Sequence, residues 1–397
     1  MKLLEYMARE IFWEHGIPVK KSIVIDCVDE MHDKINAAGL KYPVVVKAQV
    51  QAGGRGKAGG VRFAENGDEA ERHARAMFGA QVRGFTVKEL LVVEKTEIET
   101  EWYLSIITDR QSKGPLLIFS PVGGVDIEET AINEPDKIAK VPINIFRGIR
   151  DYDIIYALDR TGADMAMYAK LKDIAVNLYN AFIAYDCLLA EINPLAITPS
   201  GEFIAADGKV EVDDSALYRL PKLLALRDKH EDDPLVAEAR RFRFHFIRMD
   251  ADGTAGVISN GSGMLMGCID MFANKGIKAG AALDLGGGAT AERVREAVRI
   301  IFCAENISTL LLNIFGGITR CDEVANGVRM ALADIPADKK VVIRMDGTNR
   351  EEGLAVLADT AAIVVGSTAE GAEAICASLE VRANDGFLPG LFGEGTE

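Results

Sequence analysis

The sequence predicts an α/β protein whose C-terminal half is a doubly wound parallel sheet. Between Gly253 and Gly366 an apolar run, a glycine turn and a helical stretch follow one another five times. Strands that alternate with helices in this way form parallel sheets, because each helix carries the chain back before the next strand begins. The glycine turns all fall at the carboxyl ends of the predicted strands, which is where such sheets bind ligands.

The five apolar runs are 256–260, 281–285, 310–315, 340–345 and 361–365. A helix that starts after a glycine turn presents unpaired N–H groups, and these favour an anion. One such turn usually serves packing. Five turns at one edge predict an anion site somewhere among them.

The N-terminal half contains a second candidate anion site. A β-branched run at 43–48 ends in Lys47-Ala48 and leads into the glycine-rich segment 51–60. This pattern predicts a buried strand that brings one amine to its edge, followed by backbone N–H groups that can approach an anion closely. The lysine precedes the glycines, so the order is not that of a P-loop. Arg55 and Lys57 favour a phosphate cradle over the alternative of a flexible hairpin.

A predicted hairpin further along the chain carries metal-type ligands. Strand-like runs at 188–194 and 203–207 are joined by the turn composition of 198–201. Alternation puts Glu191 and Asn193 on one face, and a three-residue loop would place Asn193 opposite Asp207. An amide oxygen and a carboxylate suit Mg²⁺, which leaves its other positions to water and substrate phosphates. The alternative is a strand that simply ends at Asn-Pro, followed by an Asp-Gly turn.

Composition limits the possible partners. With 45 Lys+Arg and 60 Asp+Glu the formal charge is −15, which argues against nucleic acid as a partner. The basic and aromatic run 240–248 alternates strictly and predicts a half-buried strand rather than an RNA surface. Six scattered cysteines without a CxxC pattern predict reduced thiols and no zinc site. No apolar run reaches the roughly 18 residues of a membrane span, and no targeting segment is visible, so we expect a cytoplasmic protein without a membrane partner.

The length of 397 residues favours two or three domains. Periodicity is lost between residues 217 and 234, and the charged segment 229–234 predicts a linker there. Glu94 ends an apolar run in the first domain, where an acceptor could meet a ribose or a base edge. A solvated charge at a strand end is the alternative for that residue.

Taken together, these segments resemble the β subunits of succinate–CoA ligases, in which an ATP-grasp domain precedes a CoA-ligase domain. The resemblance covers nearly the whole chain and rests on the lysine strand with its glycine run, 191–195, 207–209, 260–261, 283–290 and 313–318. It implies an ATP-grasp domain at 1–235, a flavodoxin-like, doubly wound CoA-ligase domain at 236–385 and a C-terminal tail at 386–397.

The resemblance also implies roles for individual residues. Nucleotide contacts are implied for Lys47, Gly54, Arg55, Gly56, Glu94 and Glu101, one Mg²⁺ per chain for Asn193 and Asp207, and acid-substrate contacts for Asn260, Gly317, Ile318 and Thr319. Glu191 is implied to orient a phosphohistidine. Lys47 and Mg²⁺ would offset charge as the γ-phosphoryl group moves in line, while Glu191 fixes the tautomer of the receiving imidazole.

In that family an acid, CoA and a nucleoside triphosphate give acyl-CoA, nucleoside diphosphate and phosphate through a phosphorylated histidine. None of the five histidines here, His15, His32, His73, His230 and His245, lies in a glycine-rich turn that would present a reactive imidazole. The phosphorylated histidine is therefore expected on a partner subunit. The resemblance implies that this partner is an α subunit which also carries the CoA site, in a heterodimer or a heterotetramer.

Two choices stay open at this stage. After Gly16-Ile17-Pro18 the chain has Lys20, where the resemblance would place proline in ATP-specific members and glutamine in GTP-specific ones. ATP is expected and GTP is possible. The acid is expected to be succinate, with malate or citrate as alternatives. A non-catalytic nucleotide-binding subunit is a further alternative, against which the presence of Lys47, Glu191, Asn193 and Asp207 argues.

Overall fold

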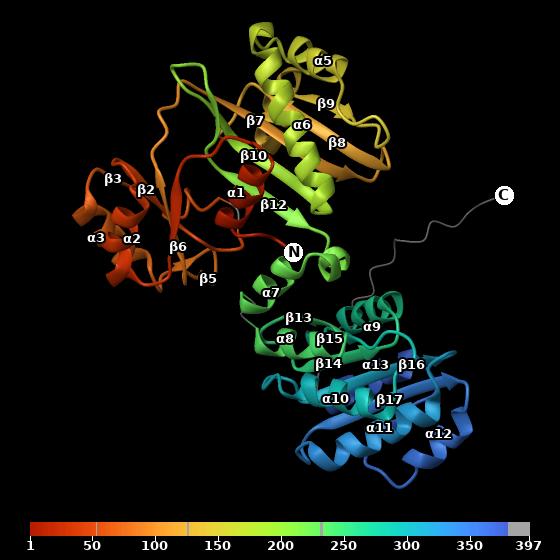
Figure 1. Ribbon diagram of the computed structural model, residues 1–397. Helices are drawn as coiled ribbons and strands as arrows, with labels where there is room; N and C mark the ends of the chain where they lie inside the picture. The colour runs from red at the N-terminus through yellow and green to blue at the C-terminus, as the bar shows by residue number, and fades with distance from the viewer. Residues whose placement is uncertain (53, 125–126, 231–232, 380–397) are drawn as a thin grey trace, which may run out of the picture. The chain divides into compact units, whose positions relative to one another are not determined.

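The computed structural model describes residues 1–52, 54–124, 127–230 and 233–379. The chain divides into two compact units, Met1–Arg227 and Asp228–Glu397 (Figure 1). Gly53 of the glycine-rich run and the predicted tail 386–397 lie outside the described residues. No helix in the described ranges combines the length and the apolar character that a bilayer crossing requires.

The first unit is built from two main antiparallel sheets with their covering helices and a separate two-stranded sheet formed by Gln81–Val82 and Phe85–Thr86. Its helices are α1 (Glu5–Glu14), α2 (Met31–Ala38), α3 (Gly67–Met77), α4 (Ile127–Asn133), α5 (Asp151–Thr161), α6 (Tyr168–Ala184) and α7 (Pro221–Lys229). Its strands are β1 (Ser22–Ile25), β2 (Val44–Ala48), β3 (Val61–Ala64), β4 (Gln81–Val82), β5 (Phe85–Thr86), β6 (Leu90–Glu94), β7 (Thr100–Asp109), β8 (Gly114–Ser120), β9 (Ala139–Pro142), β10 (Cys187–Ile197), β11 (Phe203–Ala205) and β12 (Gly208–Val212).

The smaller sheet has the order β1-β6-β2-β3, and α2 and α3 lie on one face of it (Figure 1). Every residue of the predicted strand β2 is buried. Val44 and Val46 pack into the core beneath α2 and α3. Because side chains alternate along a strand, Val45 and Lys47 face the other way, toward the cavity described below.

The larger sheet has the order β11-β10-β7-β8-β9, and β12 pairs with the other part of β10. Helices α1, α5 and α6 share one apolar core with this sheet (Figure 1). Trp102 of β7 packs edge-on against Phe119 of β8, with ring centroids 5.2 Å apart. This core supports β10 along its length, which matters because β10 carries two predicted site residues.

The second unit is a single sheet covered on both faces. Its strands are β13 (His245–Arg248), β14 (Ala255–Ser259), β15 (Ala279–Asp284), β16 (Thr309–Gly316), β17 (Lys340–Gly347) and β18 (Ile363–Val364). Its helices are α8 (Pro234–Arg241), α9 (Ser262–Asn274), α10 (Ala291–Phe302), α11 (Cys321–Asp334), α12 (Arg350–Leu357) and α13 (Thr368–Ser378).

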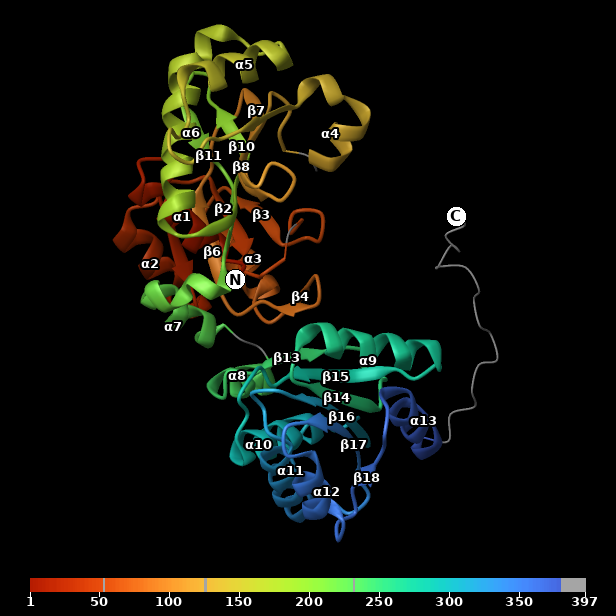
Figure 2. The same cartoon turned by 90° about the vertical axis from the view of Figure 1, so that its right-hand side faces the viewer.

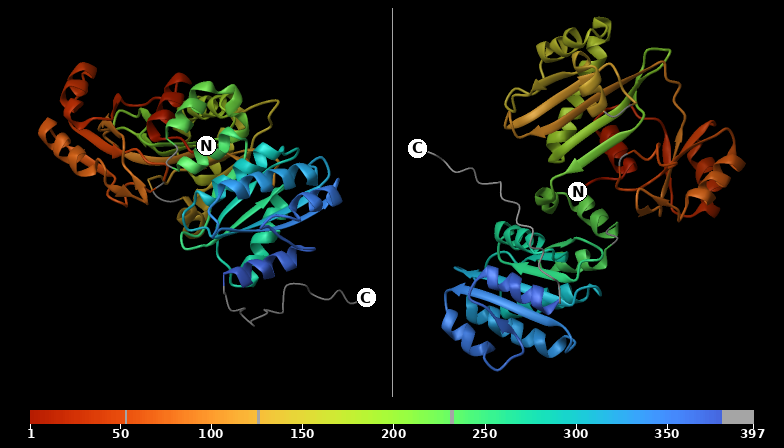
Figure 3. Two further views of the ribbon diagram at one scale, coloured as in Figure 1. Left: turned by 90° about the horizontal axis from the view of Figure 1, so that it is seen from below. Right: turned by 180° about the vertical axis from the view of Figure 1, so that it is seen from behind.

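The strand order of this sheet is β13-β15-β14-β16-β17-β18. All neighbours are parallel except β13, which runs antiparallel to β15. Helices α9 and α13 cover one face, and α10, α11 and α12 cover the other (Figure 2, Figure 3). Without its edge strand β13, the sheet has the flavodoxin-like order 2-1-3-4-5, so the predicted doubly wound fold is confirmed.

Two local predictions were wrong. The segment predicted as an aperiodic linker contains α7, which begins at Pro221 and buries Leu223 against the core of the first unit. Proline is well placed at the start of a helix, but the apolar residues of α7 do not form one stripe that periodicity could detect. The predicted strand over 240–248 is shortened to β13, because Arg240 and Arg241 end α8 and Arg243 has a φ of 59°.

Candidate active site

The first unit contains a cavity of about 940 Å³. Its walls come from α1, β2, the glycine-rich run, β6 and the hairpin strands β10 to β12. The predicted site residues that line it are Lys47, Gly54, Arg55, Gly56, Glu94, Glu191, Asn193 and Asp207. The fold therefore brings into one cavity a set of residues that span more than a third of the chain.

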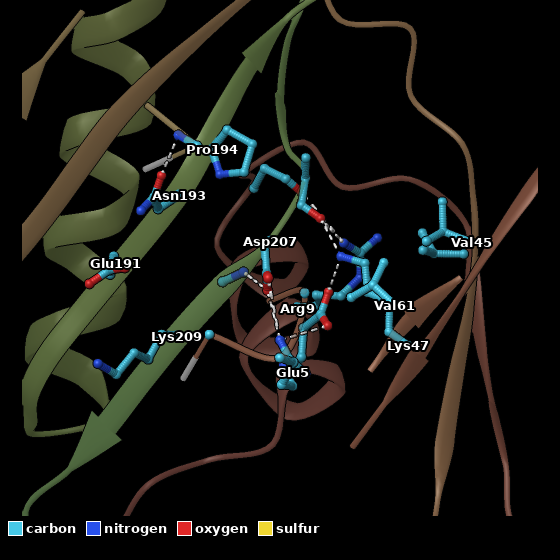
Figure 4. A pocket seen from close by; sticks show the side chains of 18 of the residues that line it. Glu5, Arg9, Val45, Lys47, Val61, Glu191, Asn193, Pro194, Asp207 and Lys209 are labelled. Carbon is cyan, nitrogen blue, oxygen red and sulfur yellow. Dashed lines mark hydrogen bonds and ion pairs between the residues drawn. The ribbon is translucent and has the colours of Figure 1, made fainter. Parts of the chain in front are cut away.

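Lys47 is held inside this cavity rather than in solvent. Its Nζ donates hydrogen bonds to Glu5 Oε1 at 2.8 Å and to the carbonyl oxygen of Ala206 at 3.0 Å (Figure 4). The side chain is 10% exposed. The prediction that the strand delivers a buried amine to its edge is confirmed.

Arg55 joins the glycine-rich run to the hairpin. Its Nη2 lies 2.9 Å from Glu5 Oε2 and donates to Asp207 Oδ1 at 3.1 Å, while Nη1 donates to the carbonyl of Ala48 at 3.2 Å. The preceding Gly54 has a φ of 69°, a conformation that a side chain disfavours. A Cβ on Gly56 would meet no atom within 4 Å, so that position is open toward the cavity.

Two charged residues of this cluster were not predicted from the sequence. Glu5, the first residue of α1, has a side chain that is 0% exposed. Arg9, one turn later, donates to the carbonyl oxygens of Lys20 at 2.7 Å and of Ala205 at 3.4 Å. Both line the cavity (Figure 4). The available signal was their spacing, because two charged residues four apart lie on the same side of a helix.

The charges of the cluster shift two carboxyl groups in opposite directions. Burial alone would raise the pKa of Glu5, but the nearby charges of Lys47, Arg55 and Arg9 outweigh it and lower that pKa. Burial and the neighbouring Glu5 charge raise the pKa of Asp207 above its ordinary value. The neighbouring cations thus favour the ionised form of Glu5, whereas burial and the Glu5 charge disfavour the ionised form of Asp207.

The hairpin places Asn193 opposite Asp207, as predicted. The backbone N–H of Asn193 donates to the carbonyl of Asp207 at 3.3 Å, and the pairing of Thr198 with Glu202 leaves 199–201 as the loop. Asn193 Oδ1 accepts the N–H of Gly124 at 2.8 Å. The Asp207 side chain is 36% exposed and lies between the Glu5 cluster and Asn193 (Figure 4).

These two side chains fit a magnesium ion by their chemistry. Mg²⁺ takes one or two protein carboxylates or amide oxygens and keeps waters and substrate phosphates in its other positions. Within the described ranges no group of three or more His, Cys, Asp or Glu side chains could hold a metal. A site with only one protein carboxylate and one amide, such as Asp207 and Asn193, is smaller than such a group and is compatible with this result.

Glu191 lies on β10 and faces the cavity. Tyr103 donates its hydroxyl hydrogen to Glu191 Oε2 at 3.4 Å, and Lys209 is the cross-strand neighbour of Glu191 on β12. Burial raises the pKa of Glu191 above its ordinary value. Tyr103 was not predicted, because only the strand pairing of β7 with β10 brings it to this carboxylate.

The two remaining glutamates that were predicted as site residues of the first unit occupy different places. Glu94 lines the cavity, and its Oε1 accepts the backbone N–H of Lys41 at 2.9 Å. Glu101 is not among the lining residues. Its side chain packs where a Cβ on Gly124 would be, so it contacts the turn whose Gly124 N–H donates to Asn193.

In the second unit the predicted acid-site residues gather at the carboxyl edge of the sheet. Asn260 ties the end of β14 to the end of β16, because its Nδ2 and Oδ1 bond the carbonyl oxygen and the N–H of Phe315 at 2.8 and 3.0 Å. The buried Thr319 accepts the N–H of Gly288 at 3.1 Å, and Ile318 is 89% exposed. A Cβ on Gly317 would meet no atom within 4 Å. The glycine turns thus share one edge, as predicted.

Comparison with known proteins agrees with this architecture. The family model of the ATP-grasp domain matches residues 2–197, and the CoA-ligase family model matches residues 258–377. The chain is thus a ligase of the ATP-grasp and CoA-ligase class.

More specific relatives match over most of their length. The chain is 41% identical over 374 residues to the ADP-forming succinate–CoA ligase subunit beta of Desulfatibacillum aliphaticivorans, covering 92% of this chain and 96% of that one. It is 42% identical over 374 residues to the subunit of the same name from Chloroflexus aurantiacus, with coverage of 94% and 97%. The chain belongs to the family of succinate–CoA ligase β subunits.

A solved structure shows the same fold at lower sequence similarity. ATP citrate lyase from Methanothrix soehngenii superposes with a TM-score of 0.76 at 18% identity, covering 96% of this chain and 99% of that chain. At this identity the likeness concerns the fold alone.

Proposed function

We propose that this chain, with an α subunit, forms succinyl-CoA from succinate and CoA as ATP is converted to ADP and phosphate. The observation that carries the proposal is the cavity in which Lys47, Arg55 and Asp207 converge. It occurs in a chain about 40% identical to named succinate–CoA ligase β subunits. The α subunit would supply the phosphorylated histidine and the CoA site, in a heterodimer or a heterotetramer, and the complex would work in the cytoplasm.

The triphosphate would be held by Lys47 and Arg55 together with the open backbone around Gly54 and Gly56. Charge-assisted hydrogen bonds from an ammonium and a guanidinium suit phosphate oxygens. Glu94 would meet the ribose or base, and Glu101 would support the turn at Gly124. Lys20 lines the same cavity. ATP is the proposed nucleotide because the named relatives are ADP-forming, and GTP is the alternative.

One Mg²⁺ per chain would be held by Asn193 and Asp207. When bound, it would neutralise phosphate charge and orient the terminal phosphate. Asp207 contributes its negative charge to this position, and Arg55 holds that carboxylate in place. Asn193 is positioned by the hydrogen bond that its Oδ1 accepts from the Gly124 N–H, and an amide oxygen is a ligand type that Mg²⁺ accepts.

Glu191 would orient the partner's imidazole during phosphoryl transfer. An ionised carboxylate that accepts one ring N–H leaves the other nitrogen free to take the phosphoryl group. Tyr103 restricts the carboxylate from one side.

The acid substrate would bind at the carboxyl edge of the second unit, together with the partner. Gly317 offers an open backbone position there, next to the exposed Ile318 and the buried Thr319. Asn260 shapes the loop through Phe315. In this proposal residues 1–235 form the nucleotide domain and 236–385 the CoA-ligase domain. Succinate is proposed rather than citrate, because the named succinate–CoA ligase relatives are about 40% identical to this chain, whereas ATP citrate lyase is 18% identical to it.

The test is an assay of the chain with its α partner. CoA-dependent release of ADP is measured with succinate, malate or citrate, and γ-labelled ATP is used to label the partner's histidine. We expect the highest kcat/KM with succinate. A higher kcat/KM with another acid would show that this acid, and not succinate, is the substrate. ATP binding without any histidine labelling would favour a non-catalytic nucleotide-binding subunit.

A further inference from the structure

The buried carboxylate of Glu5 forms ion pairs with both cations of the proposed phosphate site at the same time. Its Oε1 accepts from Lys47 Nζ at 2.8 Å, and its Oε2 lies 2.9 Å from Arg55 Nη2. The Glu5 side chain is 0% exposed, and those of Lys47 and Arg55 are each 10% exposed. A carboxylate this deeply buried is rare unless it is paired, and here both oxygens face a cation.

The position of Glu5 is set by the backbone and not by the ion pairs alone. The N–H of Leu3 donates to the carbonyl of Val210 at 2.9 Å, and the N–H of Tyr6 donates to Gln49 Oε1 at 3.1 Å. On either side of Glu5 the chain is therefore tied to β12 of the larger sheet and to the residue that follows β2 of the smaller sheet. When another anion enters, α1 holds the carboxylate close to the site.

The charge balance of the cluster shows what Glu5 does there. Lys47, Arg55 and Arg9 bring three positive charges, and Glu5 and Asp207 bring two negative ones. These five side chains sum to 3 − 2 = +1, and further basic side chains that line the cavity, among them Lys20, Lys57 and Lys209, surround them. Without Glu5 the same groups would carry a charge of +2.

We propose that Glu5 is a positioning residue of the nucleotide site: its carboxylate is a built-in counter-ion that holds Lys47 and Arg55 together, and the phosphates of the nucleotide compete with it for these two cations. The inference rests on the proposed function, since it assumes that the cavity receives a nucleoside triphosphate. It adds a residue of α1 to a site otherwise built from strands and glycine turns.

The competition has two consequences for the reaction. Glu5 weakens nucleotide binding for two reasons. Its negative charge stays next to the phosphates, and Lys47 and Arg55 must exchange the Glu5 carboxylate for phosphate oxygens. It also speeds turnover, because it keeps both cations in position and prevents the diphosphate product from binding too tightly. Binding energy spent equally on ground state and transition state gives no gain in kcat.

The test compares three variants in the complete complex with the α subunit. Glu5→Gln removes the charge at nearly constant side-chain volume. Glu5→Asp keeps the charge but shortens the side chain by one methylene group, so the carboxylate lies farther from Lys47 and Arg55. Glu10→Gln is the matched control, because Glu10 lies on the same helix and is exposed. The dissociation constant of MgATP is measured by calorimetry, and kcat and KM are measured for the overall reaction.

We expect Glu5→Gln to bind MgATP roughly tenfold more tightly and to lose about tenfold in kcat, in the range that one nearby charge produces. Glu5→Asp should fall between Glu5→Gln and the wild type, and Glu10→Gln should match the wild type. An unchanged or weaker affinity in Glu5→Gln would overturn the inference. If that variant does not fold, an unchanged or weaker affinity in Glu5→Asp would do the same. A wild-type complex that does not bind MgATP would instead contradict the proposed function.

Discussion

The two units of this chain each contain a candidate anion site, and the two candidate sites are built by different means. In the first unit, Lys47 and Arg55 are charged side chains in a cavity, and each is paired with a carboxylate from a distant segment. In the second unit, Asn260, Gly317, Ile318 and Thr319 carry no charge and lie at the glycine edge of a parallel sheet.

This difference follows from the energetics of burial. Backbone N–H groups at the start of helices attract an anion without a net charge, so they need no counter-ion when the site is empty. A buried ammonium or guanidinium does need one, because an unpaired charge in the interior costs several kcal/mol. A site made of charged side chains therefore includes its own anions, here Glu5 and Asp207.

The largest expected effect comes from Glu191→Gln, which keeps the shape of the first site but removes its proposed orienting charge. We expect histidine labelling of the partner to fall by about 10²–10⁴. The free energy of unfolding should be unchanged or higher, because burial raises the pKa of Glu191 and disfavours its charge. Pre-steady-state labelling and denaturant titration measure the two quantities.

Glu202→Gln is the control for that experiment, since Glu202 lies on the same hairpin and is exposed. If Glu191→Gln labels the partner at the wild-type rate, Glu191 has no orienting role. If it also fails to bind MgATP, its role is in the nucleotide site instead.

The next largest effect concerns the buried ion pair. Lys47→Met should cost about 3–5 kcal/mol of unfolding free energy, because it leaves the Glu5 carboxylate with one cation fewer. The double variant Glu5→Gln/Lys47→Met should recover part of this loss, and a double-mutant cycle in urea measures the coupling. If the losses of unfolding free energy are additive in the double variant, the two side chains do not stabilise one another. Lys41→Met is the control, because Lys41 is exposed.

A smaller effect is expected at the glycine edge of the second unit. Gly347 has a φ of 104°, and a Cβ there would collide with the carbonyl oxygen of Gly316. Gly347→Ala should therefore lower the unfolding free energy by about 1–3 kcal/mol. MgATP affinity should be unchanged, because the nucleotide is proposed to bind in the first unit.

Gly317→Ala is the matched comparison, because a Cβ there meets no atom within 4 Å. Its unfolding free energy should stay within about 0.5 kcal/mol of the wild type, as for a surface substitution. A raised KM for succinate with unchanged stability would support close approach of the acid to this backbone. An unchanged KM would remove Gly317 from the acid site.

The smallest expected effect is in the acid stability of the first unit. The pKa of Glu5 is lowered in the folded chain, so its ionised form stabilises the fold above the ordinary glutamate pKa of about 4.3. This contribution is lost as the pH falls from there through the lowered pKa. The stability difference between wild type and Glu5→Gln should therefore shrink on acidification, as followed by thermal unfolding between pH 6 and roughly pH 3. A difference that is constant over this range would contradict the lowered pKa.

Much of the architecture was predictable because it depends on local periodicity. Strand β2, the helices α3 and α6 and the alternating strands and helices of the second unit follow from apolar spacing and glycine turns alone. The errors occurred where the pattern was weak or misleading. Helix α7 has no clear apolar stripe, and the alternation before β13 extended into the end of α8.

The sequence by itself determined the parallel sheet with its glycine edge, the buried strand that carries Lys47 and the facing positions of Asn193 and Asp207. Each of these depends on neighbours within one element or one hairpin. Only the tertiary structure decided that Glu5 lies against Lys47, 42 residues away, and that Arg55 binds Asp207, 152 residues away. The physical reason is that a charged side chain leaves no periodic signal of its partner, because ion pairs form between segments that packing alone brings together.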